Sequence, residues 1–417
     1  MDRFPADRWF AQLAQPIGVY MITNAMNAPV LHHATLAVAA LLASRDPYDQ
    51  PQPTKVCLQR YLEHKQKALQ MVRYHLESED IGGPLAVAIA FLLITEKGNP
   101  DTRRVHMHGL KSVLQHLRAQ SFEEENTALP PSLAPLYWLS WSVGIGFDIG
   151  HATIEGDPIL DPLPFTADYE AHNRSWIQQM CGLSINNEGV EFAILLCTLR
   201  MFIHRAFHLA AIARKYRASP SYSPVHEAKI QRLCCQLERD LEEWMSRHLS
   251  LHAPALFHSP PCDNTTSFLD YPPIPMHKAH SQNVMIEYHM AKLYVSFISI
   301  PEIGPGPPES RRFEHALEIC RSLVGMKDRR WSQLAQHTRL FQLFLCCLAF
   351  GGMDSFAVES EAAVELIKAS ASQDWGFTVE ELFYRWAQHC PGLPPISPDM
   401  FPWLSDCGNK TAIVAIQ

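Results

Sequence analysis

Four segments near the N-terminus decide the fold: Pro29–Ser44 (PVLHHATLAVAALLAS), Tyr61–Leu76 (YLEHKQKALQMVRYHL), Pro84–Glu96 (PLAVAIAFLLITE) and His106–Leu117 (HMHGLKSVLQHL). Their apolar residues either run almost without interruption or return every three to four positions, which is the period of an α-helix. Short polar breaks separate one segment from the next. The sequence therefore predicts four consecutive helices that are amphipathic or buried.

The same period continues along the rest of the chain. Further helices are expected over Leu133–Phe147, Asn187–Arg217, Pro224–Leu249, His280–Ile300, Arg312–Val324, Trp331–Gly351, Asp354–Ser370 and Thr378–His389. Alternating patterns typical of strands are scarce, and no repeat of fixed length is visible. We therefore expect an all-α fold, a multi-helix bundle or array, with a central buried helix over Asn187–Arg217.

Stretches rich in proline and glycine divide this array. Breaks are expected at Glu123–Pro131, Gly150–Pro164 and Pro301–Ser310, and the region Leu251–Pro275 lacks periodicity altogether. Residues 1–390 are expected to form one all-α domain, in which a subdivision near the 251–275 loop is allowed. Residues 391–417 form a proline-rich tail.

Composition and charge argue against several classes of protein. Apolar residues make up 47 % of the 417 residues and charged residues 19 %, below the roughly 25 % of ordinary globular chains, which favours helices with large buried faces. The net charge of −8 lacks the basic footprint of an autonomous nucleic-acid binder. The opening MDRFPADRWF is unlike a secretory signal, and His32 and His33 interrupt the uncharged N-terminal stretch, so no membrane span is expected there.

The cysteines favour packing over metal binding. Eleven are scattered along the chain, an odd number, and many lie in apolar helical segments, as reduced thiols of an intracellular protein do. No two have the Cys-x2-Cys spacing of a zinc cluster. The pairs Cys234-Cys235 and Cys346-Cys347 are adjacent on helices, so their side chains diverge by about 100°. We predict no metal site at these thiols.

Two histidine pairs were weighed as metal ligands. His204 and His208 are one helical turn apart, but the segment lacks the glutamate of a zincin, and Arg200 and Arg205 beside them would repel a cation. A polar patch between helices is the favoured interpretation. His106 and His108 point in nearly opposite directions on a helix. That segment is taken as structural, with Gly109 allowing a close approach of helices.

The remaining motifs give no catalytic signature. Gly109–Ser112 lacks the spacing of a phosphate loop, and Gly144, Gly146 and Gly150 follow a helix and not a strand. No Gly-x-Ser-x-Gly elbow is present. The nearest paired carboxylates, Asp157 with Asp161 and Asp46 with Asp49, lie in proline-containing loops. The aromatic cluster Tyr137, Trp138 and Trp141 is read as core, with an apolar ligand pocket as the alternative.

The order of the first four segments resembles one family. An Ala/Leu-rich helix is followed by a Tyr-Leu-Ala-Leu-Arg helix, then by an Ala/Leu run that closes on Glu96, and then by His-x-His-Gly-Leu from His106 to Leu110. This order resembles the regulatory, or middle-homology, domain of fungal Zn2Cys6 zinc-cluster transcription factors. The likeness is most specific from Phe4 to Leu117, and the order of the predicted helices agrees with the family to about Gln388. It rests on the general pattern of apolar and polar residues, and no single motif is diagnostic.

The resemblance implies a regulator of transcription in the nucleus, with a small-molecule effector, protein partners of the transcription machinery and a possible dimer. It implies neither an enzyme nor a cofactor in this chain, because the family's zinc belongs to a separate N-terminal module. Here Met1 begins inside the regulatory domain, with no zinc cluster, basic linker or heptad segment. Contact with DNA would therefore need a missing or partner module. A lost upstream exon, a paralogue without the finger and a fragment all fit.

Two rival classes stay open. An interaction adaptor would expose an apolar groove. An all-α enzyme acting on an apolar small molecule would have converging acids or a metal cluster in a deep cavity. We rank the regulator first, then the adaptor, then the enzyme.

Overall fold

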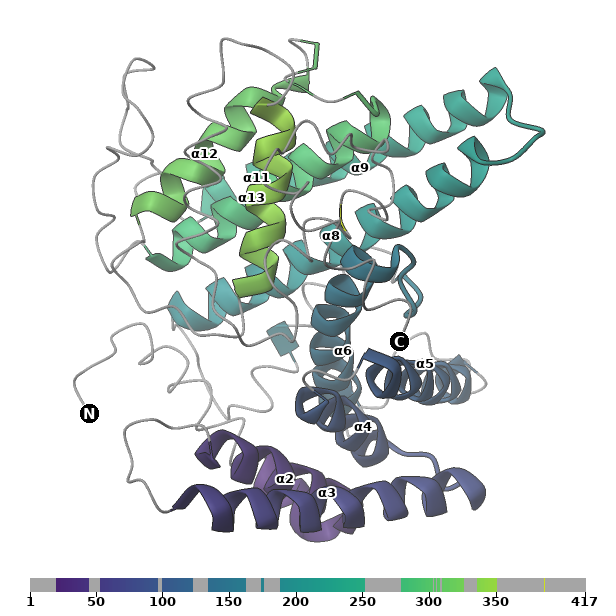
Figure 1. Ribbon diagram of the computed structural model, residues 1–417, viewed down its shortest axis with the longest axis vertical. Coiled ribbons are helices and arrows are strands. Elements are labelled where there is room, and N and C mark those ends of the chain that lie inside the picture. The colour runs from purple at the N-terminus through teal and green to yellow at the C-terminus, as the bar shows by residue number, and fades with distance from the viewer. Residues whose placement is uncertain are drawn as a thin grey trace, which may run out of the picture. The chain divides into compact units, whose positions relative to one another are not determined.

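The computed structural model describes residues 20–44, 53–96, 100–122, 134–162, 174–175, 188–251, 279–302, 304, 306–307, 310–325, 336–350 and 386. The regular elements within these residues are α-helices, and no strand occurs among them (Figure 1). The predicted all-α class is confirmed. The helix expected over 354–370 and the 391–417 tail lie outside the described part of the chain, as do all of the 251–275 loop except Leu251, which ends α9, and all of the helix expected over 378–389 except Trp386, which is helical and buried.

The chain divides into two compact units, described separately here. Unit 1 comprises Met1–Asp148 and Ile159–Ile194, and unit 2 comprises Ile149–Pro158 and Leu195–Gln417. The chain passes from one unit to the other within the helix Ala134–Glu155 and again within the helix Glu188–Arg217.

Unit 1 contains the four helices predicted from the opening segments, in the predicted order. They are α2 (Pro29–Ser44), α3 (Pro53–Glu77), α4 (Gly83–Thr95) and α5 (Pro100–Phe122), and α6 (Ala134–Glu155) follows. Proline opens α2, α3 and α5 and stands second in α4. Proline suits the first helical turn, because its fixed φ is already helical and no intrahelical acceptor exists there for an N–H. The prolines between the predicted segments thus mark helix starts.

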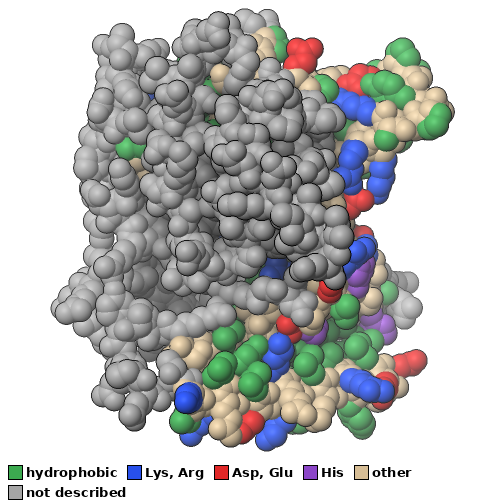
Figure 2. Space-filling model, in the orientation of Figure 1, with side chains coloured by type: hydrophobic (Ala, Val, Ile, Leu, Met, Phe, Trp, Pro, Cys, Tyr) green, Lys and Arg blue, Asp and Glu red, His purple; other side chains and the backbone are tan. Residues whose placement is uncertain are grey.

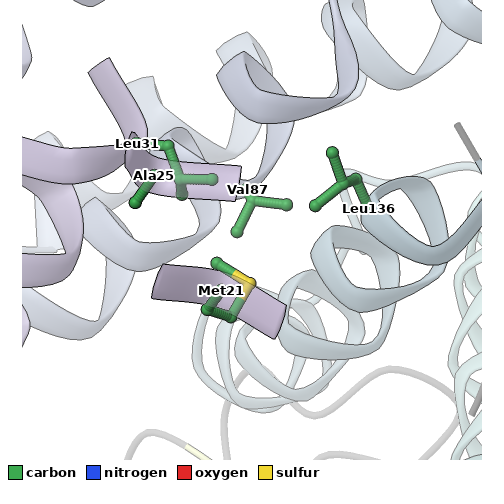
Figure 3. Packing of buried hydrophobic residues seen from close by; sticks show 5 residues of the cluster. All are labelled: Met21, Ala25, Leu31, Val87 and Leu136. Carbon is green, nitrogen blue, oxygen red and sulfur yellow. The ribbon is translucent and has the colours of Figure 1, made fainter. Parts of the chain in front are cut away.

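Packing in unit 1 centres on α4, which lies beside α2, α3 and α5. Ten of the 13 residues of α4 are buried. One cluster of the core joins α4 to residues on either side of it in the sequence (Figure 3): Met21, Ala25, Leu31, Val87 and Leu136. Burying a side chain such as Leu31 or Val87 stabilises the fold by about 1.5–3 kcal/mol. Without charge along its length, α4 has no face suited to water.

Helix α6 continues past Gly150, where a break was predicted, and ends at Glu155. Gly156 follows in a left-handed conformation with φ of +90°, which glycine adopts without steric cost. Asp148 then fixes the next turn of the chain, because its fully buried carboxylate accepts the backbone N–H groups of Ile159 (2.7 Å) and Leu160 (2.8 Å). The helix therefore ends at the last glycine of this stretch.

The close approach of helices that was predicted at Gly109 occurs at Gly144. A Cβ added at Gly109 would meet no atom within 4 Å, so that prediction was wrong. A Cβ at Gly144 would lie 2.6 Å from Leu110 Cδ2 and 3.1 Å from Leu160 Cδ1. Gly109 points into open space, because the face of α5 that packs inward carries its neighbour Leu110, which is fully buried.

These two glycines give opposite expectations for alanine. Gly109→Ala should raise the free energy of unfolding by up to about 1 kcal/mol, because alanine is the better helix former and meets nothing there. Gly144→Ala should lower it by about 1 kcal/mol or more, because overpacking against Leu110 outweighs the same helix preference. Urea unfolding followed by circular dichroism of both variants measures the difference. Equal changes in both would contradict the packing at Gly144.

Unit 2 contains α8 (Glu188–Arg217, from Leu195 onward), α9 (Pro224–Leu251), α11 (Ala279–Ser299), α12 (Arg312–Gly325) and α13 (Gln336–Phe350). A short turn joins α8 to α9, and the two helices run side by side: Arg205 bonds to Asp240 at 2.9 Å, and the rings of Phe202 and Trp244 lie 6.2 Å apart. Helix α11 lies beside α9, α12 and α13. The predicted boundaries agree with these to within a few residues, and residues 331–335 of the helix predicted over Trp331–Gly351 lie outside the described part of the chain.

The segment Ile194–Arg217 is the one described helix long and apolar enough to cross a membrane by length and composition. Of its most apolar window, 72 % is buried inside the protein. Phe207, for example, is fully buried, with its ring 4.7 Å from that of Tyr294 and 5.7 Å from that of Phe341. This is the packing of the central buried helix that the sequence predicts.

A buried arginine organises the end of α11. The Arg312 side chain donates to the backbone oxygens of Ser296 (2.7 Å), Glu302 (2.6 Å) and Ile300, and to Ser296 Oγ (3.0 Å). Its guanidinium carbon also lies 4.3 Å from the centre of the Phe297 ring. Burial lowers the pKa of Arg312 to about 10, although the Glu302 carboxylate opposes that shift. Arg312 thus adds a charged donor to carbonyls at the end of α11, two of which, those of Ser296 and Ile300, also accept a backbone N–H.

Two glycines let the chain close over this arginine. Gly306 has a φ of +67°, and a Cβ there would lie 2.8 Å from Ser310 Oγ and 3.1 Å from Arg312 Cδ. Gly304, with a φ of +106°, donates its N–H to the carbonyl of Leu348 in α13 at 2.9 Å. Within the described residues of the break predicted at Pro301–Ser310, these two glycines bring the chain against Arg312 of α12 and Leu348 of α13.

Candidate functional site

The candidate site of unit 1 is a polar cluster of four residues, Lys65, Glu96, Arg103 and His106, where α3, α4 and α5 meet. Glu96 is the C-cap of α4, and its backbone N–H donates to the carbonyl of Leu93 at 3.2 Å. Its side chain is only 6 % exposed. The apolar run of α4 thus carries a carboxylate at its end into the interior of the unit.

Each neighbouring helix supplies a donor to Glu96. The Oε1 atom lies 2.7 Å from Lys65 Nζ of α3 and 3.3 Å from His106 Nε2 of α5. Arg103 of α5 donates to the backbone carbonyl of Glu96 at 3.2 Å. Nearby, the hydroxyl of Tyr61 donates to the carbonyl of Thr95 at 3.2 Å. One residue therefore connects three helices through both its side chain and its backbone.

The electrostatics of the cluster hold Glu96 ionised. Burial by itself would raise the pKa of Glu96, but hydrogen bonds from His106 and Lys65 outweigh burial and lower it. For Lys65 burial opposes the same ion pair, and the net pKa is raised. Burial lowers the pKa of Arg103 despite the attraction of Glu96. A carboxylate of lowered pKa is a weak base, so the arrangement suits an ion-pair junction better than proton transfer.

Glu96→Gln should destabilise unit 1 by about 2 kcal/mol. The change removes the negative charge that Lys65 and Arg103 interact with, in a site that is largely closed to water. The wild type should also lose stability as pH falls below about 4.5, the ordinary pKa of the carboxyl group, since its folded pKa is lower than that value. Thermal unfolding at pH 7 and pH 4 measures both effects. The exposed residue Glu63 provides the control, and Glu63→Gln should be near neutral.

His106 and His108 point in different directions on α5, as predicted. His106 faces Glu96, whereas His108 is exposed. His204 is fully buried on α8 and its ring centre is 4.7 Å from that of His208, in an edge-to-face contact. Arg205 is engaged by Asp240 on α9. These observations fit the predicted polar patch between helices.

The two aspartates considered as a catalytic pair belong to different contacts. Asp157 bonds to Arg214 of α8 and lies 3.5 Å from Lys215 in unit 2. Asp161 bonds to Lys111 of α5 at 2.8 Å and accepts from Gln115, both in unit 1. The other candidate pair, Asp46 with Asp49, lies outside the described residues.

Three of the four adjacent cysteines pack in the core as predicted, and Cys235 does not. Cys234 is buried and Cys235 is exposed on α9, and burial raises the pKa of the Cys234 thiol to about 12. Cys346 and Cys347 are both buried in α13, and Cys346 Sγ donates to the carbonyl of Ala316 at 3.6 Å. Within the part of the chain that the structure describes, no group of three or more His, Cys, Asp or Glu side chains is placed to hold a metal ion.

The aromatic cluster of α6 is core. Tyr137, Trp138 and Trp141 are buried and contact one another edge to face, with ring centres 5.3 Å and 6.2 Å apart. Burial raises the pKa of the Tyr137 hydroxyl.

The chain matches no known family model, no curated protein and no solved structure.

Glu96 and His106 belong to the sequence pattern that resembles the family, but no contact between them was predicted, and neither Lys65 nor Arg103 was a predicted site residue. A signal for the cluster was present. A glutamate ends an apolar helix of 13 residues, and an arginine and a histidine follow seven and ten positions later. A charge at the edge of a buried helix needs donors nearby, and the next helix supplies two of them.

Proposed function

We propose that this chain is a helical regulatory domain that controls transcription in the nucleus, of the type that accompanies fungal zinc-cluster modules. The observation that supports this is the polar cluster. Lys65, Glu96 and His106 come from three of the four segments on which the family resemblance rests, and they meet at one carboxylate. Three of the four segments that resemble the family are therefore connected through contacts with the Glu96 carboxylate.

In this proposal the domain switches a DNA-binding module carried by a partner or by another segment. Moving α4 away from α3 or α5 would leave a largely buried charge without its partner, which costs several kcal/mol. The three helices should therefore shift together between two discrete arrangements. An effector, such as a metabolite or a component of the transcription machinery, acts by binding one arrangement better than the other.

The test is a fusion of the full chain to a heterologous DNA-binding module in a fungal reporter strain. The fusion is expected to change reporter output relative to the module alone, and a fluorescent fusion is expected to accumulate in the nucleus. Glu96→Gln should alter the output at matched protein level, whereas the exposed control Glu63→Gln should not. An unchanged reporter together with a cytoplasmic fusion would refute the proposal.

An interaction adaptor is the second candidate, favoured by apolar side chains that α3 presents to solvent. Leu62 is 55 % exposed and Tyr74 66 % exposed, and Val56 and Leu58 are exposed as well. The region of α2 and α3 in Figure 2 shows apolar side chains among charged ones. Affinity purification with wild type and a Leu58→Glu, Leu62→Glu variant distinguishes the two: an adaptor loses its partner in the variant, whereas reporter control through the polar cluster persists.

A further inference from the structure

Two imidazoles from neighbouring helices face each other in unit 1. His33 of α2 and His64 of α3 form a hydrogen bond between their Nδ1 atoms, which lie 3.0 Å apart, so one ring is the donor and the other the acceptor; the ring centres are 5.2 Å apart and the ring planes make an angle of 28°. Both side chains are partly exposed at the edge of the α2–α3 interface. Solvent and small ions can therefore reach the pair.

The spacing of the two nitrogens fits coordination of one ion. Neutral imidazole nitrogen is the commonest protein ligand for transition metals, with a metal–nitrogen distance of about 2.0–2.1 Å. Two such bonds at 90° to 110° place the nitrogens roughly 2.9–3.4 Å apart, and the observed separation lies in that range. We propose that His33 and His64 form a two-imidazole site for a divalent transition ion such as Zn²⁺, Ni²⁺ or Cu²⁺, with water in its other coordination positions.

Burial and neighbouring positive charges lower the pKa of both imidazoles. The pKa of His33 is lowered by burial, then by His64, His32 and Lys67. The pKa of His64 is lowered by burial, then by Lys67, His32 and Arg60, with Glu63 opposing. A neutral imidazole has one nitrogen with a free lone pair, so an ion that binds both Nδ1 atoms replaces the hydrogen bond between the rings, and the donor ring carries its proton on Nε2 instead. The same cations reduce the attraction for a dication, so Lys67→Gln should tighten binding.

A bound ion would join α2 to α3. An ion held by both histidines in the folded state is held less well by an unfolded chain, so it stabilises the fold by mass action. At a free ion concentration tenfold above the dissociation constant, the midpoint of thermal unfolding of unit 1 should rise by about 3 °C or more. A hard ion such as Mg²⁺ prefers oxygen ligands and should not act this way.

The experiment uses the full chain, stripped of metal with EDTA and dialysed, at pH 7.5. Thermal unfolding and equilibrium dialysis are carried out with Ni²⁺, Zn²⁺ or Mg²⁺. We expect Ni²⁺ and Zn²⁺ to raise the midpoint with one histidine-dependent ion per chain, and Mg²⁺ to have no effect. The gain should disappear in His33→Ala and in His64→Ala, and should shrink at pH 5.5, where imidazoles take up protons.

His108→Ala is the matched control, because it removes an exposed histidine of the same unit and should leave the gain intact. Exposed Cys235 can also bind these ions, so the difference between wild type and the His33→Ala variant is the decisive quantity. An equal gain in both, or no gain in the wild type, would overturn the proposal. So would loss of the gain in His108→Ala but not in His33→Ala.

Discussion

Replacing Arg312 with alanine is expected to lower the free energy of unfolding of unit 2 by about 3–5 kcal/mol. The guanidinium is fully buried and donates to the carbonyls of Ser296, Ile300 and Glu302. Without it these carbonyls lose a charged donor and the buried side chain leaves a cavity, although Ser296 O and Ile300 O still accept the backbone N–H groups of Ile300 and Glu302. Each buried polar group left unsatisfied costs about 1–3 kcal/mol.

Arg312→Lys should recover only part of this stability, because an ammonium cannot reproduce a planar fork that reaches several carbonyls at once. Exposed Arg239 on α9 offers a control in the same unit, and Arg239→Ala should change stability by less than about 0.5 kcal/mol. Denaturant unfolding combined with hydrogen exchange locates the effect, and the amides of α11 and α12 should lose protection first. If Arg312→Ala were as stable as Arg239→Ala, the capping role of Arg312 would be wrong.

Acidification from pH 7.5 to pH 4.5 is expected to cost unit 2 about 3–5 kcal/mol through one histidine pair, in which His315 is buried and His289 is partly exposed. His289 of α11 and His315 of α12 place their Nδ1 atoms 3.0 Å apart. Burial lowers the pKa of His289 to about 4, helped by Arg311 and Lys292. Burial, followed by His289 and the same two cations, lowers the pKa of His315 to about 2.

The direction of this effect follows from which state binds protons. The unfolded chain takes up protons on both histidines below about pH 6.5, whereas the folded pair resists protonation down to about pH 4 and below. The contribution to stability is therefore complete above pH 6.5 and is lost as the pH falls below it. For His289 the loss ends near pH 4.

The measurement is the slope of unfolding free energy against pH in the wild type and in His315→Gln. Each histidine that stays neutral in the fold contributes about 1.4 kcal/mol per pH unit in this window. The variant should therefore show a slope shallower by about that amount. His108→Gln, which changes an exposed histidine, should keep the slope of the wild type. Parallel slopes in all three proteins would show that the pair takes up protons freely.

Much of the fold follows from the period of the apolar residues. The helix predicted at Pro29–Ser44 has those bounds in the structure, and α9 and α12 begin where predicted. The predictions were wrong where tertiary packing overrode a local preference of the sequence. A glycine normally weakens a helix, yet α6 runs through Gly150, because Gly156 and the carboxylate of Asp148 end it later. Gly109 and Gly144 look equivalent in the sequence, and only their orientation toward Leu110 distinguishes them.

The polar contacts were less predictable, because they join residues far apart along the chain. Lys65 and Glu96 are brought together by the turn between α3 and α4, and His33 and His64 by the packing of α2 on α3. Periodicity shows that such side chains face a neighbouring helix, but it does not show which residue they meet. Arg312 is the clearest case, since a charged residue at a predicted helix start would ordinarily be placed at the surface.

The position of Arg312 has a consequence for biosynthesis. The residue that caps α11 lies thirteen positions beyond Ser299, where that helix ends. At a translation rate of about 5–20 residues per second, the ribosome finishes α11 roughly one to three seconds before it delivers the cap. During that interval the end of α11 lacks the side chain that caps it in the folded protein. A nascent chain that stops before residue 312 should therefore leave the end of α11 less stable than a chain that includes Arg312.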